Sequence, residues 1–483
     1  MKRVCGAVVL LGLAIAFAEN GARYLIITHD NYYQSIQPLA QWKHAKGMMC
    51  KVTRLSQIGY DTTAIKNYIR NAYNTWPVRP EYILLVGSPW DLPARYYVIQ
   101  HGGSYTSDNI YGDMTGDLHV ELPVGRFPCR STAQCDVMVA KTLAYEKTPD
   151  LTDSLWMRRL TTVVNENEDP DDTIYWNDVR IAATLAGANN FKSCDSLSKL
   201  RGHTATSVVN SVTSGTAMVL YRGSGVGNWY QPFAVNPALT NNGNKLPIIL
   251  SITCETMTLA PGESMVGDAW VKTGTVANLR GAVAFFGNTH SLQSGTTTVR
   301  KRSTVARAFF KALFQEQNYK LGRAIIRAKD SLYQVFADVA EYRGFNLLGD
   351  PELDIWTDTP RHPDIEHPAA IQPGPQQFPV TVSLRGAPFA GALVCVSMDT
   401  TVYAYGYTDN QGSIILDINP QDTGQLRLVV TGHNLYPYDT QVPVTQVAIT
   451  EPNPGAIILS GLSAAPVVFT RSVRFSPSAG LPD

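Results

Sequence analysis

The sequence predicts an α/β domain with a largely parallel sheet, followed by a small β-sandwich. Between Arg23 and Trp356, short apolar runs alternate with helix-compatible segments, which is the order of strands and covering helices in such a domain. Beyond a proline-rich stretch, apolar runs alternate only with turn residues, as in an immunoglobulin-like sandwich. The chain has 483 residues, of which 44% are hydrophobic, so it can bury a large core.

The elements of the α/β part follow from local patterns. Asp61 is a candidate N-cap for a helix whose apolar positions recur at helical spacing from Ile65 to Ala72. Gly47 stands where the preceding helix needs a left-handed stop. Further helices are expected over residues 173–185, 304–313 and 321–336, and strands over residues 24–28, 82–87, 160–164, 217–221, 247–251 and 281–286.

We divide the chain accordingly. Residues 1–18 form a signal peptide, residues 19–150 an N-terminal α/β subdomain, and residues 151–357 a second α/β subdomain that carries the candidate site. Residues 358–379 are rich in proline and read as a semi-rigid linker. Residues 380–446 form the immunoglobulin-like sandwich, and residues 447–483 form a tail whose role the sequence does not indicate.

The signal peptide is predicted from its charge and hydropathy pattern. Lys2 and Arg3 precede an apolar run from Val8 to Phe17, and Ala18 closes a small-residue cleavage site. The apolar run is shorter than the roughly 20 residues that a membrane-spanning helix needs. We therefore expect an exported mature chain without a membrane span, in an extracellular, periplasmic or cell-surface location.

Composition argues against several function classes. Forty basic residues balance forty acidic ones, so the overall charge does not favour a nucleic-acid partner. The cysteines lack CxxC spacing, which argues against a zinc site or a dithiol redox motif, and we expect no required cofactor. A disulfide between Cys129 and Cys135 is conceivable in an exported protein, but small buried thiols explain most of these cysteines.

Two of the expected strands end in polar tips. One leads into Gly223-Ser224-Gly225, and the next along the chain leads into Cys254. Glycines beside Ser224 allow backbone N–H groups to approach a ligand closely. Because parallel strands deliver their carboxyl ends to one edge of a sheet, we expect Ser224 and Cys254 to lie side by side.

At these residues the chain resembles the gingipain-like cysteine peptidases, which have a caspase-like core. The similarity extends from Tyr24 to about Ile355 and is followed, as in that family, by a β-sandwich. Tyr221-Arg-Gly-Ser-Gly225 stands where that family has a Tyr-x-Gly-His-Gly tip, and the specificity of the resemblance comes from many stretches that match in the right order. The stretches that carry the resemblance are residues 24–29, 39–43, 46–47, 80–87, 107–112, 122–127, 241–247, 281–287 and 349–353.

The resemblance implies a role for several residues. Cys254 is the expected nucleophile, and Ser224 occupies the position of the catalytic histidine. The backbone N–H groups of Gly225 and Cys254 are expected to bind the oxyanion. Glu166 is the best match to the acidic residue that orients the histidine, although Glu168 and Asp169 lie close by in the sequence.

The serine changes the functional expectation. Serine neither carries the positive charge of an imidazolium nor protonates a leaving amine, so peptide hydrolysis should be weak or absent. His290 follows the strand after Cys254 and is a candidate alternative base; a loop histidine or pocket wall is the competing interpretation. The chain is thus interpreted as a secreted cysteine endopeptidase of reduced or lost activity, with a peptide-binding or cell-surface scaffold protein as the alternative.

One further run suggests a structural ion. Asp108, Asp113 and Asp117 supply oxygen ligands at a loop spacing that suits calcium, without matching an EF-hand. Related enzymes bind calcium, and a solvated turn explains the same residues equally well. The expected partner at the candidate site is a peptide or protein, and the sequence leaves the residue preference open.

Overall fold

The computed structural model describes residues 21–99, 103–262, 264–291 and 296–446. The predicted signal peptide, residues 1–18, and the predicted tail, residues 447–483, lie outside the described residues. Among the helices within the described ranges, none is long and apolar enough to cross a membrane.

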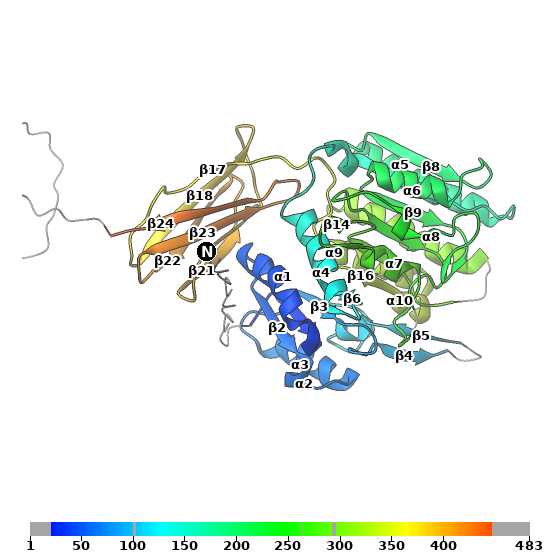
Figure 1. Cartoon of the computed structure of the whole chain (residues 1–483), viewed down its shortest axis with the longest axis horizontal. Coiled ribbons are helices and arrows are strands. Elements are labelled where there is room, and N and C mark those ends of the chain that lie inside the picture. Colours follow the sequence, from blue (N-terminus) through cyan, green and yellow to red (C-terminus); the bar gives the residue numbers. More distant parts are fainter. Residues whose placement is uncertain (1–20, 100–102, 263, 292–295, 447–483) are drawn as a thin grey trace, which may run out of the picture. The chain divides into compact units, whose positions relative to one another are not determined.

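A ten-stranded sheet forms the centre of the α/β part (Figure 1). Neighbouring strands run parallel except for one antiparallel pair, β15 and β16, so the predicted largely parallel sheet is confirmed. In spatial order the strands are β2 (Cys50–Arg54), β1 (Tyr24–Thr28), β3 (Tyr82–Val86), β6 (Val124–Phe127), β16 (Phe345–Leu348), β15 (Ala284–Asn288), β12 (Ile248–Ile252), β9 (Met218–Arg222), β7 (Arg159–Val164) and β8 (Ser193–Ser198).

Helices cover both faces of this sheet, because successive side chains of each buried strand point to opposite faces. Along β12, Ile248 and Leu250 pack with α5, α8 and α9, whereas Ile249 packs with α1, α4, α6 and α7. Asp61 caps α3 as predicted, accepting hydrogen bonds from two backbone N–H groups at 2.9 Å. The helices are α1 (Tyr33–Ala45), α2 (Leu55–Ile58), α3 (Thr62–Thr75), α4 (Thr132–Glu146), α5 (Asp171–Ala188), α6 (Ala205–Ser214), α7 (Val266–Lys272), α8 (Thr296–Phe314), α9 (Leu321–Phe336) and α10 (Val339–Gly344).

The antiparallel pair divides the sheet into two halves of opposite direction. Strand β16 comes late in the sequence, yet it runs parallel to β6 of the first half and antiparallel to β15 of the second. The carboxyl ends of β9, β12 and β15 therefore share one edge, while those of β1 and β3 face the other way. This geometry selects which strand tips can form a site together.

The C-terminal part contains two antiparallel four-stranded sheets that share one apolar core. Their immunoglobulin-like type stays a prediction. One sheet contains β17 (Asp364–Glu366), β18 (Gln376–Leu384), β19 (Ala387–Pro388) and β22 (Ser413–Ile418), and the other contains β21 (Val402–Tyr407), β20 (Leu393–Met398), β23 (Gly424–Thr431) and β24 (Tyr438–Val444).

The segment predicted as a linker, residues 358–379, contains strand structure. Strand β17 lies within it and β18 begins there, at Gln376. Strand β17 pairs only with Thr381 to Ser383 of β18, so it does not reach Pro379. Pro379 is compatible with β18 because proline has no N–H to donate on the side that β17 leaves unpaired. Short strands elsewhere are β4 (Arg95–Val98), β5 (Ser104–Ser107), β10 (Gly225–Val226), β11 (Asn228–Trp229), β13 (Gly274–Thr275) and β14 (Asn278–Leu279), and the 3-10 turns are Asp30–Tyr32, Asn109–Tyr111, Ser154–Arg158 and Pro237–Leu239.

Candidate active site

The tips of β9 and β12 lie next to each other at the carboxyl edge of the sheet. The two strands pair in parallel, with Arg222 opposite Ile252. Two further contacts join the chain where it leaves the strands. The hydroxyl of Thr253 donates to the carbonyl of Gly223 at 2.6 Å, and Arg222 donates to the carbonyl of Ile252. The tips that carry Ser224 and Cys254 are therefore fixed to one another.

Glycine is required on both sides of Ser224. Gly223 has a φ of 152°, and a Cβ there would lie 2.7 Å from the Cβ of Asn165. A Cβ on Gly225 would lie 2.7 Å from the carbonyl oxygen of Asn228, across the β10–β11 hairpin. The same hairpin reaches the second tip, because the N–H of Gly227 donates to the carbonyl of Glu255 at 2.7 Å.

A cavity of about 270 Å³ opens over the two tips. Both Ser224 and Cys254 line it and are partly exposed, as a site for a ligand requires. The rest of the lining comes from the segment before and into α5, from the β9 and β11 ends, and from the first turns of α8: Asn167, Asp169, Asp171, Tyr175, Arg222, Gly223, Tyr230, Thr298, Val299 and Arg302.

The sulfur of Cys254 contacts a buried arginine. Arg302 extends from α8 and is only 4% exposed. Its Nη1 donates to the Cys254 sulfur at 2.8 Å. Its Nε and Nη2 donate to the two carboxylate oxygens of Glu341 at 3.1 and 2.7 Å. A planar guanidinium suits this geometry because it can present separate N–H groups to two partners.

The Arg302–Glu341 pair is held in its charged form. Burial raises the pKa of Glu341, but the charge and hydrogen bonds of Arg302, together with His290, lower that pKa to about 2. Burial likewise opposes the charge on Arg302, but Glu341 and Cys254 together raise the pKa of Arg302. A positive charge is therefore permanent beside Cys254.

Ser224 has no comparable partner. Its hydroxyl oxygen accepts a long hydrogen bond from the Nδ2 of Asn167, at 3.4 Å. Its backbone carbonyl accepts from the Tyr221 hydroxyl at 2.6 Å and from the Tyr230 N–H at 3.1 Å, which fixes the tip rather than the side chain. Neither amide nor phenol takes up a proton near neutral pH, so these contacts supply no base.

Glu166 is placed away from the Ser224 side chain. It is fully buried, and its carboxylate accepts hydrogen bonds from the Ser198 hydroxyl and, at 2.8 Å, from the N–H of Lys199. Asn167 is the neighbour that turns towards Ser224, and Asp169 lines the cavity. The orienting role predicted for Glu166 stays a prediction.

His290 lies next to Glu341 and Tyr105. It is fully buried, with its Nδ1 3.7 Å from Glu341, and its ring is tilted against Tyr105. That separation is too long for a hydrogen bond, and neither ring nitrogen has a hydrogen-bond partner within the described ranges. Cys254 contacts Arg302, Arg302 contacts Glu341, and Glu341 lies 3.7 Å from His290. The role of His290 as an alternative base stays a prediction.

The calcium candidates are separate from this site. Both carboxylate oxygens of Asp108 accept from Arg126 at 2.7 Å, whereas Asp113 and Asp117 each accept from a nearby backbone N–H. Among the described residues, the group whose ligand atoms could hold a metal ion is instead Glu146, Asp350 and Glu352. Calcium binding at the three aspartates stays a prediction.

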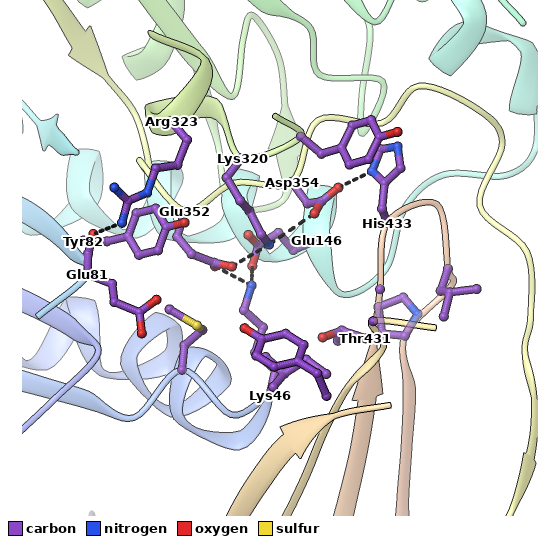
Figure 2. A pocket seen from close by; sticks show the side chains of 18 of the residues that line it. Lys46, Glu81, Tyr82, Glu146, Lys320, Arg323, Glu352, Asp354, Thr431 and His433 are labelled. Carbon is purple, nitrogen blue, oxygen red and sulfur yellow. Dashed lines mark hydrogen bonds and ion pairs between the residues drawn. The ribbon is translucent and has the colours of Figure 1, made fainter. Parts of the chain in front are cut away.

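A second cavity, of about 310 Å³, is lined by two of these acids, Glu146 and Glu352 (Figure 2). Lys46 pairs there with Glu146 at 3.0 Å and with Glu352 at 2.5 Å. Lys43, which is fully buried, pairs with all three carboxylates. The ammonium groups of Lys43 and Lys46 thus pair with the acids that a metal ion would need.

Sequence reasoning did not identify Arg302 or Asn167 as site residues. Arg302 follows Arg300 and Lys301 in a helical run, a pattern that is typical of a solvated charged face. Only the packing of α8 against the tip of β12 distinguishes Arg302 from its neighbours.

The fold therefore brings a serine tip and a cysteine tip side by side at one edge of a largely parallel sheet, over a common cavity. The model of Peptidase family C25 matches residues 17–356. Because this match covers more than half of the chain, the chain belongs to Peptidase family C25, and the predicted resemblance to gingipain-like peptidases is confirmed.

Individual relatives agree with this assignment. Gingipain R2 of Porphyromonas gingivalis is 24% identical over 488 residues, which cover 96% of this chain and 62% of that protein. Gingipain R1 of the same organism is 22% identical, covering 86% of this chain and 42% of that protein. The crystal structure of the arginine-specific cysteine proteinase gingipain R superimposes with a TM-score of 0.78 at 21% identity, covering 89% of this chain and 99% of that one. This chain therefore spans only part of the length of its curated relatives.

Proposed function

We propose that this chain is an exported member of the cysteine peptidase family that binds peptides over Cys254 but hydrolyses their amide bonds slowly at most. One observation carries the proposal. Ser224 and Cys254 line the same cavity at fixed neighbouring tips, and the residue at the first tip is a serine. Binding and a nucleophile are thus retained, while the group that would move protons is replaced.

The missing proton transfer decides the expected rate. Amide hydrolysis needs a group that protonates the departing nitrogen, and a serine hydroxyl is too weak an acid for this role. Arg302 is close enough to the sulfur but does not release its proton near neutral pH. Losing one member of a nucleophile–base pair costs several orders of magnitude in rate. Slow hydrolysis follows from these three points together.

A non-catalytic peptide-binding or cell-surface scaffold protein is the second candidate. The observation that favours it is the Arg302 contact, because the side chain nearest the sulfur is a cation that cannot serve as a general base. Export is proposed because the residues from Lys2 to Ala18 have the pattern of a signal peptide: basic residues, then an apolar run, then a small-residue cleavage site.

The test uses the mature chain and a mixed library of peptides. Ser224→His should raise the cleavage rate by at least about 100-fold, the order of a general acid–base contribution. Cys254→Ala in either background should abolish cleavage. If the native chain cleaves peptides as fast as Ser224→His, the proposal is wrong. If the native chain binds library peptides and Ser224→His cleaves none, the binding-protein alternative is supported instead.

A further inference from the structure

We propose that Cys254 accepts acyl groups from activated esters and thioesters without a histidine, and that Arg302 makes this possible by stabilising the thiolate. The inference rests on the proposed function in one respect, that Cys254 is the nucleophile. It assigns a catalytic role to a residue, Arg302, that touches the reacting atom, and it names a substrate class other than the peptide amide.

Contact geometry carries the first step. A guanidinium N–H at 2.8 Å from sulfur interacts much more strongly with a thiolate than with a thiol, because the charge and the hydrogen bond then act together. Arg302 cannot turn away, since Glu341 holds its other two nitrogens and the side chain is 4% exposed. The N–H group of Arg302 is therefore held against the sulfur before a substrate binds.

The other charged groups near the cavity do not contact the Cys254 sulfur. Arg222 at the cavity wall is paired with Asp178 at 2.8 Å, and Arg307 also contacts Asp178 at 2.6 Å. Asp169 and Asp171 also line the cavity, and no contact joins either carboxylate to the sulfur within the described residues. Glu341 contacts the other nitrogens of the guanidinium, and His290 lies 3.7 Å from Glu341. The cationic N–H is therefore the charged group in direct contact with the sulfur.

The chemistry of the leaving group decides which substrates react. The thiolate adds to the acyl carbon, a C–S bond forms, and the bond to the leaving group breaks with its electron pair. An aryl oxide or a thiolate departs as a stable anion and needs no proton, whereas an amine must be protonated as it leaves. The oxyanion meanwhile faces the N–H groups expected from Gly225 and Cys254. Activated acyl donors thus bypass the step that Ser224 cannot perform.

The same reasoning predicts what happens next. Hydrolysis of the S-acyl product needs a base that deprotonates water, and the cavity lining offers no histidine for this. Transfer should therefore stop at the thioester. The expected signature is one rapid equivalent of leaving group followed by slow turnover.

The experiment uses the full mature chain and p-nitrophenyl acetate. One equivalent of p-nitrophenolate should appear rapidly, and peptide mapping should place one acetyl group on Cys254. Cys254→Ala corrects for other nucleophiles, including the exposed Cys194. Arg302→Met should slow acylation by about 10- to 100-fold, the range of a hydrogen bond to a charged group. The matched control is Arg300→Met, an exposed arginine of the same helix, which should acylate at the native rate.

Two further measurements separate chemistry from folding. Methylguanidinium added to Arg302→Ala should restore part of the lost rate, because the removed side chain lined the cavity, and should not affect Arg300→Ala. In the unmodified protein, iodoacetamide should alkylate Cys254 faster in the native chain than in Arg302→Met. The proposal is overturned if both alkylate at the same rate, or if folded Arg302→Met acylates at the native rate. Neither result depends on how fast peptides are cleaved, so the proposed function can fail separately.

Discussion

Arg302 donates one N–H to the sulfur of Cys254 at 2.8 Å while its remaining nitrogens hold both carboxylate oxygens of Glu341. This relationship joins the candidate nucleophile to a buried ion pair on α8 and α10. The position that family resemblance assigns to a proton carrier is instead a serine. The site therefore combines a fixed positive charge with the absence of a titrating base at the tip of β9.

The ion pair should make the stability of the chain depend on acid. The folded-state pKa of Glu341 is lowered from 4.5 to about 2, so the carboxylate stabilises the fold above pH 4.5. That stability is lost as the pH falls from 4.5 through about 2. Glu341→Gln should lower the free energy of unfolding by about 3 kcal/mol at neutral pH, and by less in acid.

Denaturant unfolding of both proteins at neutral and acid pH checks this expectation. Glu316→Gln is the matched control, because its pair with Arg327 is solvent-exposed and should contribute less than about 1 kcal/mol. An equal stability of Glu341→Gln and Glu316→Gln at neutral pH would contradict the prediction.

The first tip should not accept a side chain at Gly223. Alanine there would have to adopt a φ of 152° with its Cβ 2.7 Å from that of Asn165, at a cost of about 1–3 kcal/mol. Because the N–H of Gly225 on the same tip, which is expected to bind the oxyanion, would move, acylation of Cys254 should slow as well. Gly187→Ala on α5 is the control: a Cβ there meets no atom within 4 Å, and stability should rise by up to about 1 kcal/mol. Thermal unfolding of both variants gives the answer, and an unchanged Gly223→Ala would count against the tip geometry.

The buried lysine of the acidic group should be essential for folding stability. Lys43 is fully buried and pairs with Glu146, Asp350 and Glu352, so Lys43→Met removes the ammonium that pairs with Asp350 and should cost about 3–5 kcal/mol. Urea unfolding measures this loss against Lys311→Met, an exposed lysine on α8. The deficit should shrink in acid as the carboxylates take up protons. A Lys43→Met protein as stable as the control would show that the cluster contributes nothing net.

Much of the architecture was predictable from local sequence. Fully buried parallel strands read as unbroken apolar runs, which is why the strands now seen as Tyr24–Thr28 and Ile248–Ile252 were expected within a residue or two. The meeting of Ser224 and Cys254 followed from the parallel pairing of neighbouring strands. The strands inside residues 358–379, which are β17 and the start of β18, were missed. The many prolines there favoured a linker over a strand in the prediction.

The rest depends on contacts between distant residues. Arg302 lies 48 residues from Cys254, and its helix gives no local sign that one arginine of three is buried. The sequence showed that Glu166 follows a strand, but it did not show which groups its carboxylate contacts. Those groups are the Ser198 hydroxyl and the Lys199 N–H. Similarly, β16 pairs with β6, which lies much earlier in the sequence. The spacing of apolar residues predicts a strand but does not predict which distant strand it pairs with.

The central claim is that this site retains a nucleophile but has lost the proton carrier needed for amides. The most direct measurement is the kcat/KM of one peptide amide against that of its p-nitrophenyl ester, in the native chain and in Ser224→His. We predict that the native chain acylates with the ester and scarcely cleaves the amide, and that Ser224→His raises the amide value by at least about 100-fold with little change for the ester. Equal amide values in the native chain and Ser224→His would contradict the account.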